Sequence, residues 1–240
     1  MSILKIAKQL QKDKTHFIIE GKSFVHEIPE NIGIECFFID ESKKENFDIN
    51  YYKNRAKVHI ISGNNFKKLA GTVTPQGILA LCERPIYKIP ENATFYLFLD
   101  DIRDPGNMGT IIRTAESAGV DVIFVSNGCV DIYNSKVLRS TMGAIFNLPI
   151  FSVDLVSTLK KLQDFKIVCT SPNAKKTYYE EAFEEKIAIL IGNEAKGISD
   201  EVFKEATTTV NIPIVGKSES LNASVATGII LYEVLRQRMT

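Results

Sequence analysis

The chain has 240 residues, of which 45% are hydrophobic and 24% are charged, and its formal net charge at pH 7 is zero. This length suits one large domain or two small ones, and the composition is ordinary for a globular protein. A net charge of zero excludes a protein that coats nucleic acid by charge alone. No apolar run approaches the ~20 residues that span a bilayer, which excludes a transmembrane helix.

The N-terminal residues 1–17 are amphipathic and lack the apolar core and the cleavage site of a secretory signal, so we expect a cytoplasmic protein. The cysteines agree, because they are scattered singly without metal-ligand spacing and three lie in or beside apolar runs. Free cysteines in such runs usually behave as small buried hydrophobes, and we expect no metal site. The four are Cys36, Cys82, Cys129 and Cys169.

Over the first 90 residues, short apolar runs alternate with polar, helix-compatible stretches, which is typical of a small α/β domain. Its expected strands contain residues 17–19, 36–39, 58–61 and 78–82. These 90 residues hold 14 Lys and Arg against 10 Asp and Glu, so they are the better candidate for contact with phosphate. Two prolines in residues 84–92 then predict a linker or a domain edge.

The same alternation returns at larger scale in residues 93–240, which predicts a mainly parallel sheet with helices on its faces. The expected strands cover residues 95–99, 122–125, 167–170, 187–191 and 208–212. The expected helices cover residues 108–118, 155–163, 199–205 and 221–237. Ligands bind at the carboxyl ends of such strands, so the loops that follow the first, fourth and fifth strands are the candidate functional segments.

The first of these loops, residues 100–109, makes a tight proline–glycine turn and leads into a helix that carries Arg113 in an apolar run. A turn with Asn107 and a basic residue six positions later can hold a phosphate or a ribose, and an ordinary surface arginine explains it equally well. The glycine spacing matches neither a dinucleotide fingerprint nor a Walker loop. A generic nucleotide-binding enzyme is therefore the weaker alternative.

The second loop, residues 191–197, places Glu194 between two glycines at the mouth of the sheet, where a solvated turn is the plain alternative. In the third loop, Ser220 or a neighbour can cap the last helix. Capping by one serine leaves Asn222 unexplained, since asparagine is a poor residue for the first turn of a helix unless its amide has a partner.

Together these segments resemble three motifs of the SpoU (TrmH) family of SPOUT methyltransferases. The first matches residues 104–115 (DPGNMGTIIRTA), and the second matches residues 191–197 (IGNEAKG). The third combines residues 212–214 (IPI) with residues 220–224 (SLNAS), and residues 139–149 resemble the segment between the first two motifs. Three ordered motifs at this spacing are a specific signal, which one motif alone is not.

The front of the chain is similar to the family's RNA-binding accessory domain, which itself resembles a small ribosomal protein. Residues 17–21 (FIIEG) match its opening segment and residues 74–80 (TPQGILA) its closing strand. Residues 14–16 depart from the pattern, because many relatives carry an arginine there. The resemblance implies an accessory domain over residues 1–90 and a SpoU methyltransferase domain over residues 93–240.

The implied fold is a parallel sheet flanked by helices whose C-terminal segment threads a trefoil knot, a rare topology. The implied activity is transfer of a methyl group from S-adenosyl-L-methionine (AdoMet) to a ribose 2′-hydroxyl of structured RNA, with ribosomal RNA favoured over transfer RNA. By motif position, backbone groups of Gly192, Ile212 and Leu221 hold the cofactor. The resemblance also implies a homodimer through the knotted domain. The alternative is a catalytically inactive RNA-binding or ribosome-associated module.

The resemblance gives Arg113 the central catalytic role, with Asn107, Glu194, Ser220 and Asn222 as orienting and hydrogen-bonding groups around it. Free arginine has a pKa above ~12 and rarely acts as a base. Arg113 is therefore either the base or the ligand of an RNA phosphate that also stabilises the developing alkoxide. A decayed site has no reason to keep four residue types together, which favours the enzyme over the inactive module; the four residues are Asn107, Arg113, Glu194 and Asn222.

Overall fold

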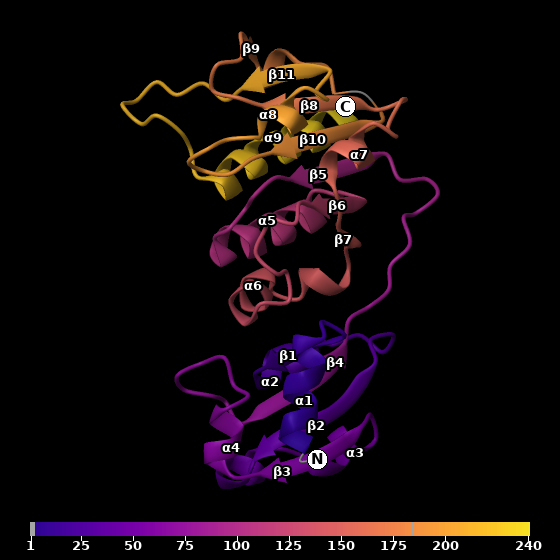
Figure 1. Ribbon diagram of the computed structural model, residues 1–240, viewed down its shortest axis with the longest axis vertical. Coiled ribbons are helices and arrows are strands. Elements are labelled where there is room, and N and C mark those ends of the chain that lie inside the picture. Colours follow the sequence, from indigo (N-terminus) through magenta and orange to yellow (C-terminus); the bar gives the residue numbers. More distant parts are fainter. Residues whose placement is uncertain (1–2, 184) are drawn as a thin grey trace. The chain divides into compact units, whose positions relative to one another are not determined.

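The computed structural model describes residues 3–183 and 185–240 (Figure 1). The chain forms two compact units, and each is described by itself. The first contains residues 1–86 and 133–146, and the second contains residues 87–132 and 147–240. The proline-bearing residues 84–90 have no regular secondary structure.

A four-stranded mixed sheet in the order β1-β4-β2-β3 forms the centre of the first unit. β4 pairs antiparallel with β1 and β2, whereas β2 pairs parallel with β3. All four expected strands are confirmed, with bounds β1 (His16–Glu20), β2 (Ile34–Asp40), β3 (Lys57–Ile61) and β4 (Ile78–Glu83).

Helices cover this sheet on both faces. α1 (Ile3–Lys12) and α4 (Gly63–Lys67) share one face, where Ala7 and Phe66 join an apolar cluster with strand residues such as Phe38. On the opposite face, Phe37 meets Tyr52 edge-on with ring centroids 5.2 Å apart. The remaining helical segments are α2 (Lys22–His26), η1 (Glu41–Asn46), α3 (Ile49–Lys53), α6 (Ser135–Thr141) and η2 (Ala144–Phe146).

The second unit contains a seven-stranded sheet in the order β7-β6-β5-β10-β8-β11-β9, and all of its neighbouring strands pair parallel. This confirms the predicted parallel α/β architecture. β10 inserts between β5 and β8, which makes a topological switch point, the place where such sheets bind ligands. The strands are β5 (Phe95–Leu99), β6 (Val122–Val125), β7 (Ile150–Ser152), β8 (Lys166–Thr170), β9 (Lys176–Thr177), β10 (Ile187–Ile191) and β11 (Thr208–Asn211).

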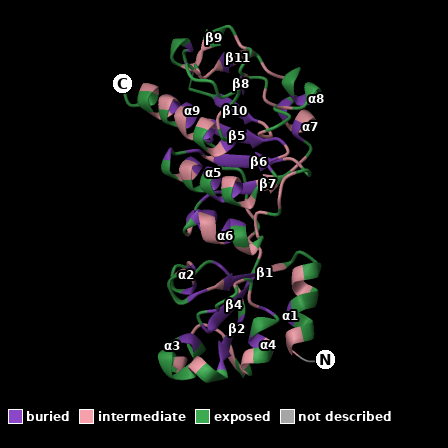
Figure 2. Cartoon of the chain, turned by 90° about the vertical axis from the view of Figure 1, so that its left-hand side faces the viewer, coloured by how far each residue is buried: buried purple, intermediate pink, exposed green. Residues whose placement is uncertain are grey.

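Helices also cover both faces of the second sheet, as Figure 2 shows. α5 (Pro105–Ser117) packs beside α9 (Ala223–Arg238) on one face. α7 (Leu155–Leu159) and α8 (Asp200–Phe203) lie on the other, in one apolar cluster with strand residues such as Phe98. The 3-10 segment η3 (Tyr178–Glu180) follows β9.

All four expected helices differ in their bounds from the prediction, α8 and α9 by no more than two residues at either end and the other two by more. α5 begins at Pro105, three residues early, because the Asp104 carboxylate caps it by accepting from the Asn107 amide at 2.8 Å, and proline suits the first turn. α7 ends at Leu159, four residues before the expected end.

Burial of the cysteines follows the sequence prediction. Cys36, Cys82 and Cys169 are buried, and burial raises the pKa of each thiol to about 12. Cys129 is half-buried. No helix in the described part of the chain is long and apolar enough to cross a membrane, and the cytoplasmic location stays a prediction.

Candidate active site

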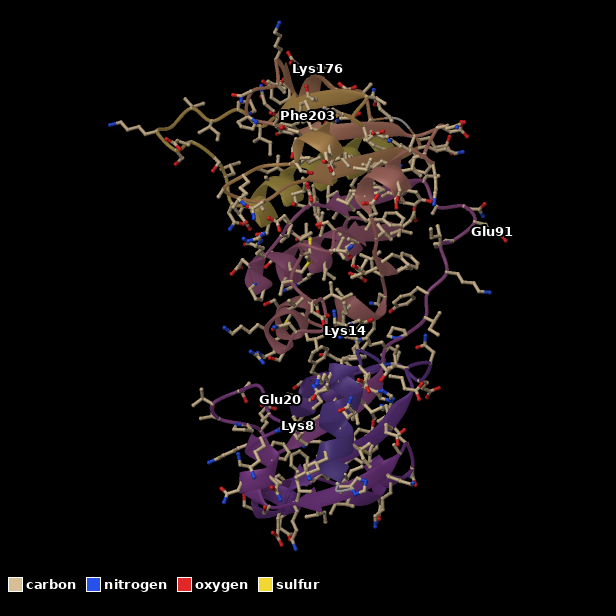
Figure 3. The ribbon with its side chains drawn as sticks, in the orientation of Figure 1. Lys8, Lys14, Glu20, Glu91, Lys176 and Phe203 are labelled. Atoms are coloured by element: carbon tan, nitrogen blue, oxygen red, sulfur yellow. The ribbon has the colours of Figure 1, made fainter. Side chains whose placement is uncertain are left out.

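A pocket of about 860 Å³ lies at the carboxyl ends of β8, β10 and β11 in the second unit. This volume is within the range of small-molecule sites. The loops that follow the three strands line it, together with the start of α9 and part of α8, including Phe203 (labelled in Figure 3). Figure 1 shows the long loop between β11 and α9 extending away from the sheet.

The pocket gathers five of the eight residues proposed from the sequence. They are Gly192, Glu194, Ile212, Ser220 and Leu221. Asn107 and Asn222 do not line the pocket but connect to Glu194 by hydrogen bonds, and Arg113 does neither. In the described structure, the second and third motifs therefore meet at the pocket. The first motif is joined to them through the side chain of Asn107.

The loop after β10 is a tight turn closed on itself. The Asn193 amide donates to the Gly197 carbonyl at 3.0 Å, and the Gly197 amide returns a bond to the Asn193 carbonyl at 2.8 Å. A Cβ on Gly192 would collide with the backbone of Gly197 and Ile198. Gly197 itself has φ +71°, a conformation that L side chains rarely adopt. Both glycines are thus required by the turn.

Two further residues hold this turn against the loop after β5. The Asn193 Nδ2 donates to the Asp101 carbonyl at 2.9 Å. The Asp100 carboxylate accepts from both the backbone amide and the hydroxyl of Ser199, at 2.9 and 2.7 Å. Sequence reasoning missed this role for Asp100 and Asn193, although two acidic residues directly after a buried strand were the available signal.

A chain of side-chain hydrogen bonds links the three motifs. The Asn107 Nδ2 donates to the Glu194 carboxylate. The Asn222 Nδ2 donates to the Asn107 Oδ1 at 2.9 Å. Because each amide uses its nitrogen toward one partner and its oxygen toward the other, the order Asn222, Asn107, Glu194 fixes the orientation of both amides.

Asn222 also caps the last helix, so the cap is this residue and not Ser220. Its Oδ1 accepts from the Ser224 amide at 2.9 Å and from the Ser224 hydroxyl at 2.6 Å. The amide partner that the sequence left unexplained is therefore Asn107. Ser220 is exposed in the loop that lines the pocket and is free of a capping role.

Arg113 lies on α5 with its side chain exposed. Among the described residues its guanidinium has no hydrogen bond or ion pair, so it is available to an incoming group. α5 packs against α9, where a Cβ on Gly228 would touch the Thr114 methyl at 3.7 Å. Arg113 thus projects from a helix pair and not into the pocket of its own chain.

Among the described residues, no group of potential metal ligands lies at this pocket. In the part of the chain that the structure describes, the one such group is His16, Glu35 and Glu83, whose ligand atoms lie within 4.8 Å of one another in the first unit. The expected absence of a metal stays a prediction.

A parallel sheet with a pocket of this size at its switch point is typical of α/β proteins that bind small molecules. The sequence profile of the SpoU rRNA Methylase family matches residues 94–232, and that of an MRM3-like substrate binding domain matches residues 4–80. The chain belongs to the SpoU rRNA methylase family.

Individual relatives agree with this assignment. The chain is 32% identical over 235 residues to the 23S rRNA (guanosine(2553)-2′-O)-methyltransferase RlmP of Bacillus subtilis, covering 96% of this chain and 93% of that one. An AdoMet-bound rRNA methyltransferase from Sinorhizobium meliloti has a similar structure, with a TM-score of 0.83, 26% identity and 99% and 95% of the two chains covered. An RNA 2′-O ribose methyltransferase structure matches with a TM-score of 0.78, 28% identity and the same coverage.

Proposed function

We propose that this protein transfers a methyl group from AdoMet to a ribose 2′-hydroxyl of ribosomal RNA. The observation that carries the proposal is the convergence of the second and third motif loops on one pocket, with the first motif joined to them through Asn107. The names of the relatives support both the ribose position and ribosomal RNA as the substrate. The family's motifs are complete, so the inactive RNA-binding module has no supporting observation.

Two properties of the pocket lining suit AdoMet: the backbone groups that it presents and the charge of its side chains. Gly192 lets the turn after β10 close tightly at the pocket because it lacks a Cβ, and Ile212 and Leu221 bring further backbone groups to the same pocket. The lining includes more carboxylates than cations, which favours a ligand with a sulfonium and an ammonium group. The charged lining residues are Glu194, Lys196, Asp200 and Glu219.

AdoMet supplies an electrophilic methyl group bonded to a positively charged sulfur. The chain's own residues must then orient the ribose and assist loss of its hydroxyl proton. Arg113 binds the RNA phosphate beside the target ribose and stabilises the negative charge that develops on the hydroxyl oxygen. The Asn222–Asn107–Glu194 chain holds the first and third motif loops at a fixed position relative to the pocket.

The active site of the proposed enzyme is completed by a second copy of the chain. The position of Arg113 outside its own pocket supports this, because this arginine can act at a pocket only if the pocket belongs to a second copy. The α5–α9 pair carries exposed apolar side chains, among them Val225 and Tyr232, each 51% exposed, which suit an interface between two copies. The family's trefoil knot, formed by the C-terminal loops around the pocket, belongs to the same proposal.

Two measurements with purified protein test the proposed function. Calorimetry should detect AdoMet binding, with or without RNA. Radiolabelled AdoMet should then deliver its methyl group to unmodified ribosomal RNA. A protein that binds no AdoMet under either condition would not be a methyltransferase.

A further inference from the structure

We infer that the outer surface of α1 and α4 binds phosphate groups of the RNA substrate through a set of lysines, here called the lysine surface: Lys5, Lys8, Lys12, Lys67 and Lys68. The inference rests on the proposed function, because it assigns a contact surface to the same RNA. It concerns the first unit alone and is independent of the AdoMet pocket.

Helix α1 places three of these lysines on one side. Residues 5, 8 and 12 fall within an arc of about 60° when the helix turns 100° per residue. Successive lysines are separated along the axis by about 4.5 and 6 Å. All three are exposed, whereas Ala7 is buried against the sheet. Figure 3 labels Lys8 on this helix. The three cations therefore lie along one side of the helix.

Helix α4 extends the same layer. Phe66 of α4 packs in the apolar cluster that also holds Ala7 of α1, so the two helices lie on the same face of the sheet, as Figure 2 shows. Lys67 ends α4 and Lys68 follows it, and both are exposed. The Lys68 Nζ reaches only the Asn65 side chain, at 3.5 Å. Two more exposed cations therefore lie on the helical layer that covers this face of the sheet.

Within the part of the chain that the structure describes, the helices of the lysine surface carry no carboxylate that would neutralise it. Neither α1 nor α4 contains an acidic residue. Asp13, just beyond α1, accepts a hydrogen bond from Gln9 at 2.8 Å, and Glu20 accepts from the Gly71 amide at 2.8 Å. Within the described residues, no lysine of the surface has an ion pair. The positive charge of the lysine surface is therefore available to bind a polyanion.

The composition of the surface indicates phosphate as the group it binds. Lysine ammonium groups act on phosphate as mobile point charges, and recognition of bases needs stacking aromatics or planar hydrogen-bonding groups. Phe66, the one aromatic residue of the two helices, is buried. The lysine surface would therefore position RNA through its backbone without reading its sequence.

The dependence of RNA affinity on salt tests this inference. Filter binding of an unmodified 23S rRNA transcript is measured between about 50 and 200 mM KCl for the full-length chain. The triple variant Lys5→Gln, Lys8→Gln, Lys12→Gln should lower the slope of log K against log salt by about 2 to 3. The pair Lys67→Gln, Lys68→Gln should lower it by about 1 to 2 on its own.

A matched control removes the same charge elsewhere in the unit. Lys44→Gln, Lys53→Gln, Lys57→Gln alters three exposed lysines outside α1 and α4 and should leave the slope near that of the unaltered chain. The inference would be overturned if the control and the α1 variant lowered the salt slope equally, or if neither lowered it.

AdoMet calorimetry on the same proteins separates this inference from the proposed function. Each variant should bind AdoMet as the unaltered chain does, because none of the altered lysines lines the pocket. A chain that shows the predicted slopes but never binds AdoMet would refute the proposed function and leave the lysine surface standing. If the unaltered chain methylates RNA but both lysine variants keep its salt slope, the lysine surface would be refuted and the proposed function would stand.

Discussion

Asn222 donates a hydrogen bond from its Nδ2 to the Oδ1 of Asn107 at 2.9 Å, across 115 positions of the sequence. Asn107 in turn donates to Glu194. Asn222 thus caps α9 and also fixes the side-chain amide of Asn107, which lies in the first turn of α5. These two bonds make one hydrogen-bonded unit of the three motifs.

The direction of these bonds can be tested at Asn107. Replacing Asn107 with Asp keeps its shape but removes the donor to Glu194 and sets two carboxylates against each other. We expect methyl transfer to fall about 100-fold, the size of effect seen when one positioned donor is lost. The control is Asn147→Asp, which removes a bond of the same type to Glu116, outside the pocket, and should leave the rate unchanged. Equal methyl-transfer rates for the two variants would show that the hydrogen bonds among Asn222, Asn107 and Glu194 do not support catalysis.

The turn after β10 predicts the effect of a single methyl group. Gly192→Ala places a Cβ against the backbone of Gly197 and Ile198, so the turn has to open and the pocket lining shifts. AdoMet binding by calorimetry should weaken at least about 100-fold. The matched control is Gly216→Ala in the third loop, where a Cβ meets nothing within 4 Å and binding should be unaffected. A Gly192→Ala protein of normal affinity would show that this backbone does not hold the ligand.

The proposed completion of each site by a second copy of the chain predicts complementation between inactive variants. Arg113→Ala should bind AdoMet normally but lose about 1,000-fold in methyl transfer, because it removes the cation and not the pocket. Ser117→Ala, one turn beyond Arg113 at the end of the same helix and exposed, should change neither AdoMet binding nor methyl transfer. Mixing inactive Arg113→Ala with inactive Gly192→Ala protein should then restore about a quarter of full activity, since half of randomly formed dimers carry one intact site. No recovery in a mixture proven to exchange subunits would contradict the shared site.

Acid stability should depend on Glu181. Its side chain is 3% exposed, and burial alone would raise the pKa of the carboxyl, but hydrogen bonds and charge from Lys166 and Lys176 lower the pKa below its ordinary 4.5. A lowered folded-state pKa contributes stability that is present above the ordinary value and is lost as the pH falls through the folded-state pKa.

Urea unfolding of a Glu181→Gln variant measures this contribution. At pH 7 the variant should lose about 3 kcal/mol in the free energy of unfolding, because two lysines lose their buried partner. Below the folded-state pKa of Glu181 the difference should shrink. Asp164→Asn removes the exposed partner of Lys186, 3.9 Å away, and should cost under about 1 kcal/mol at any pH. A Glu181→Gln protein as stable as this control would contradict the assignment.

The sequence predicted the fold class because strands such as residues 95–99 and 187–191 are buried on both faces and read as unbroken apolar runs. It could not predict β7 and β9, which have three and two residues and show no periodicity. The sequence could predict a cap near Asn222 for the last helix. It could not predict the hydrogen bond to Asn107, because a bond between distant loops depends on tertiary structure. The same limit applies to Asp100 and Ser199, which meet only after the sheet has formed.

Nucleoside analysis of methylated RNA tests the central claim most directly. Unmodified 23S rRNA is incubated with the protein and AdoMet, digested to nucleosides and examined by mass spectrometry. The account predicts one added methyl group on a ribose 2′-oxygen, which also makes the adjacent phosphodiester resistant to alkali. It further predicts loss of that product with Arg113→Ala. A methyl group on a base, or full ribose methylation by Arg113→Ala, would contradict it.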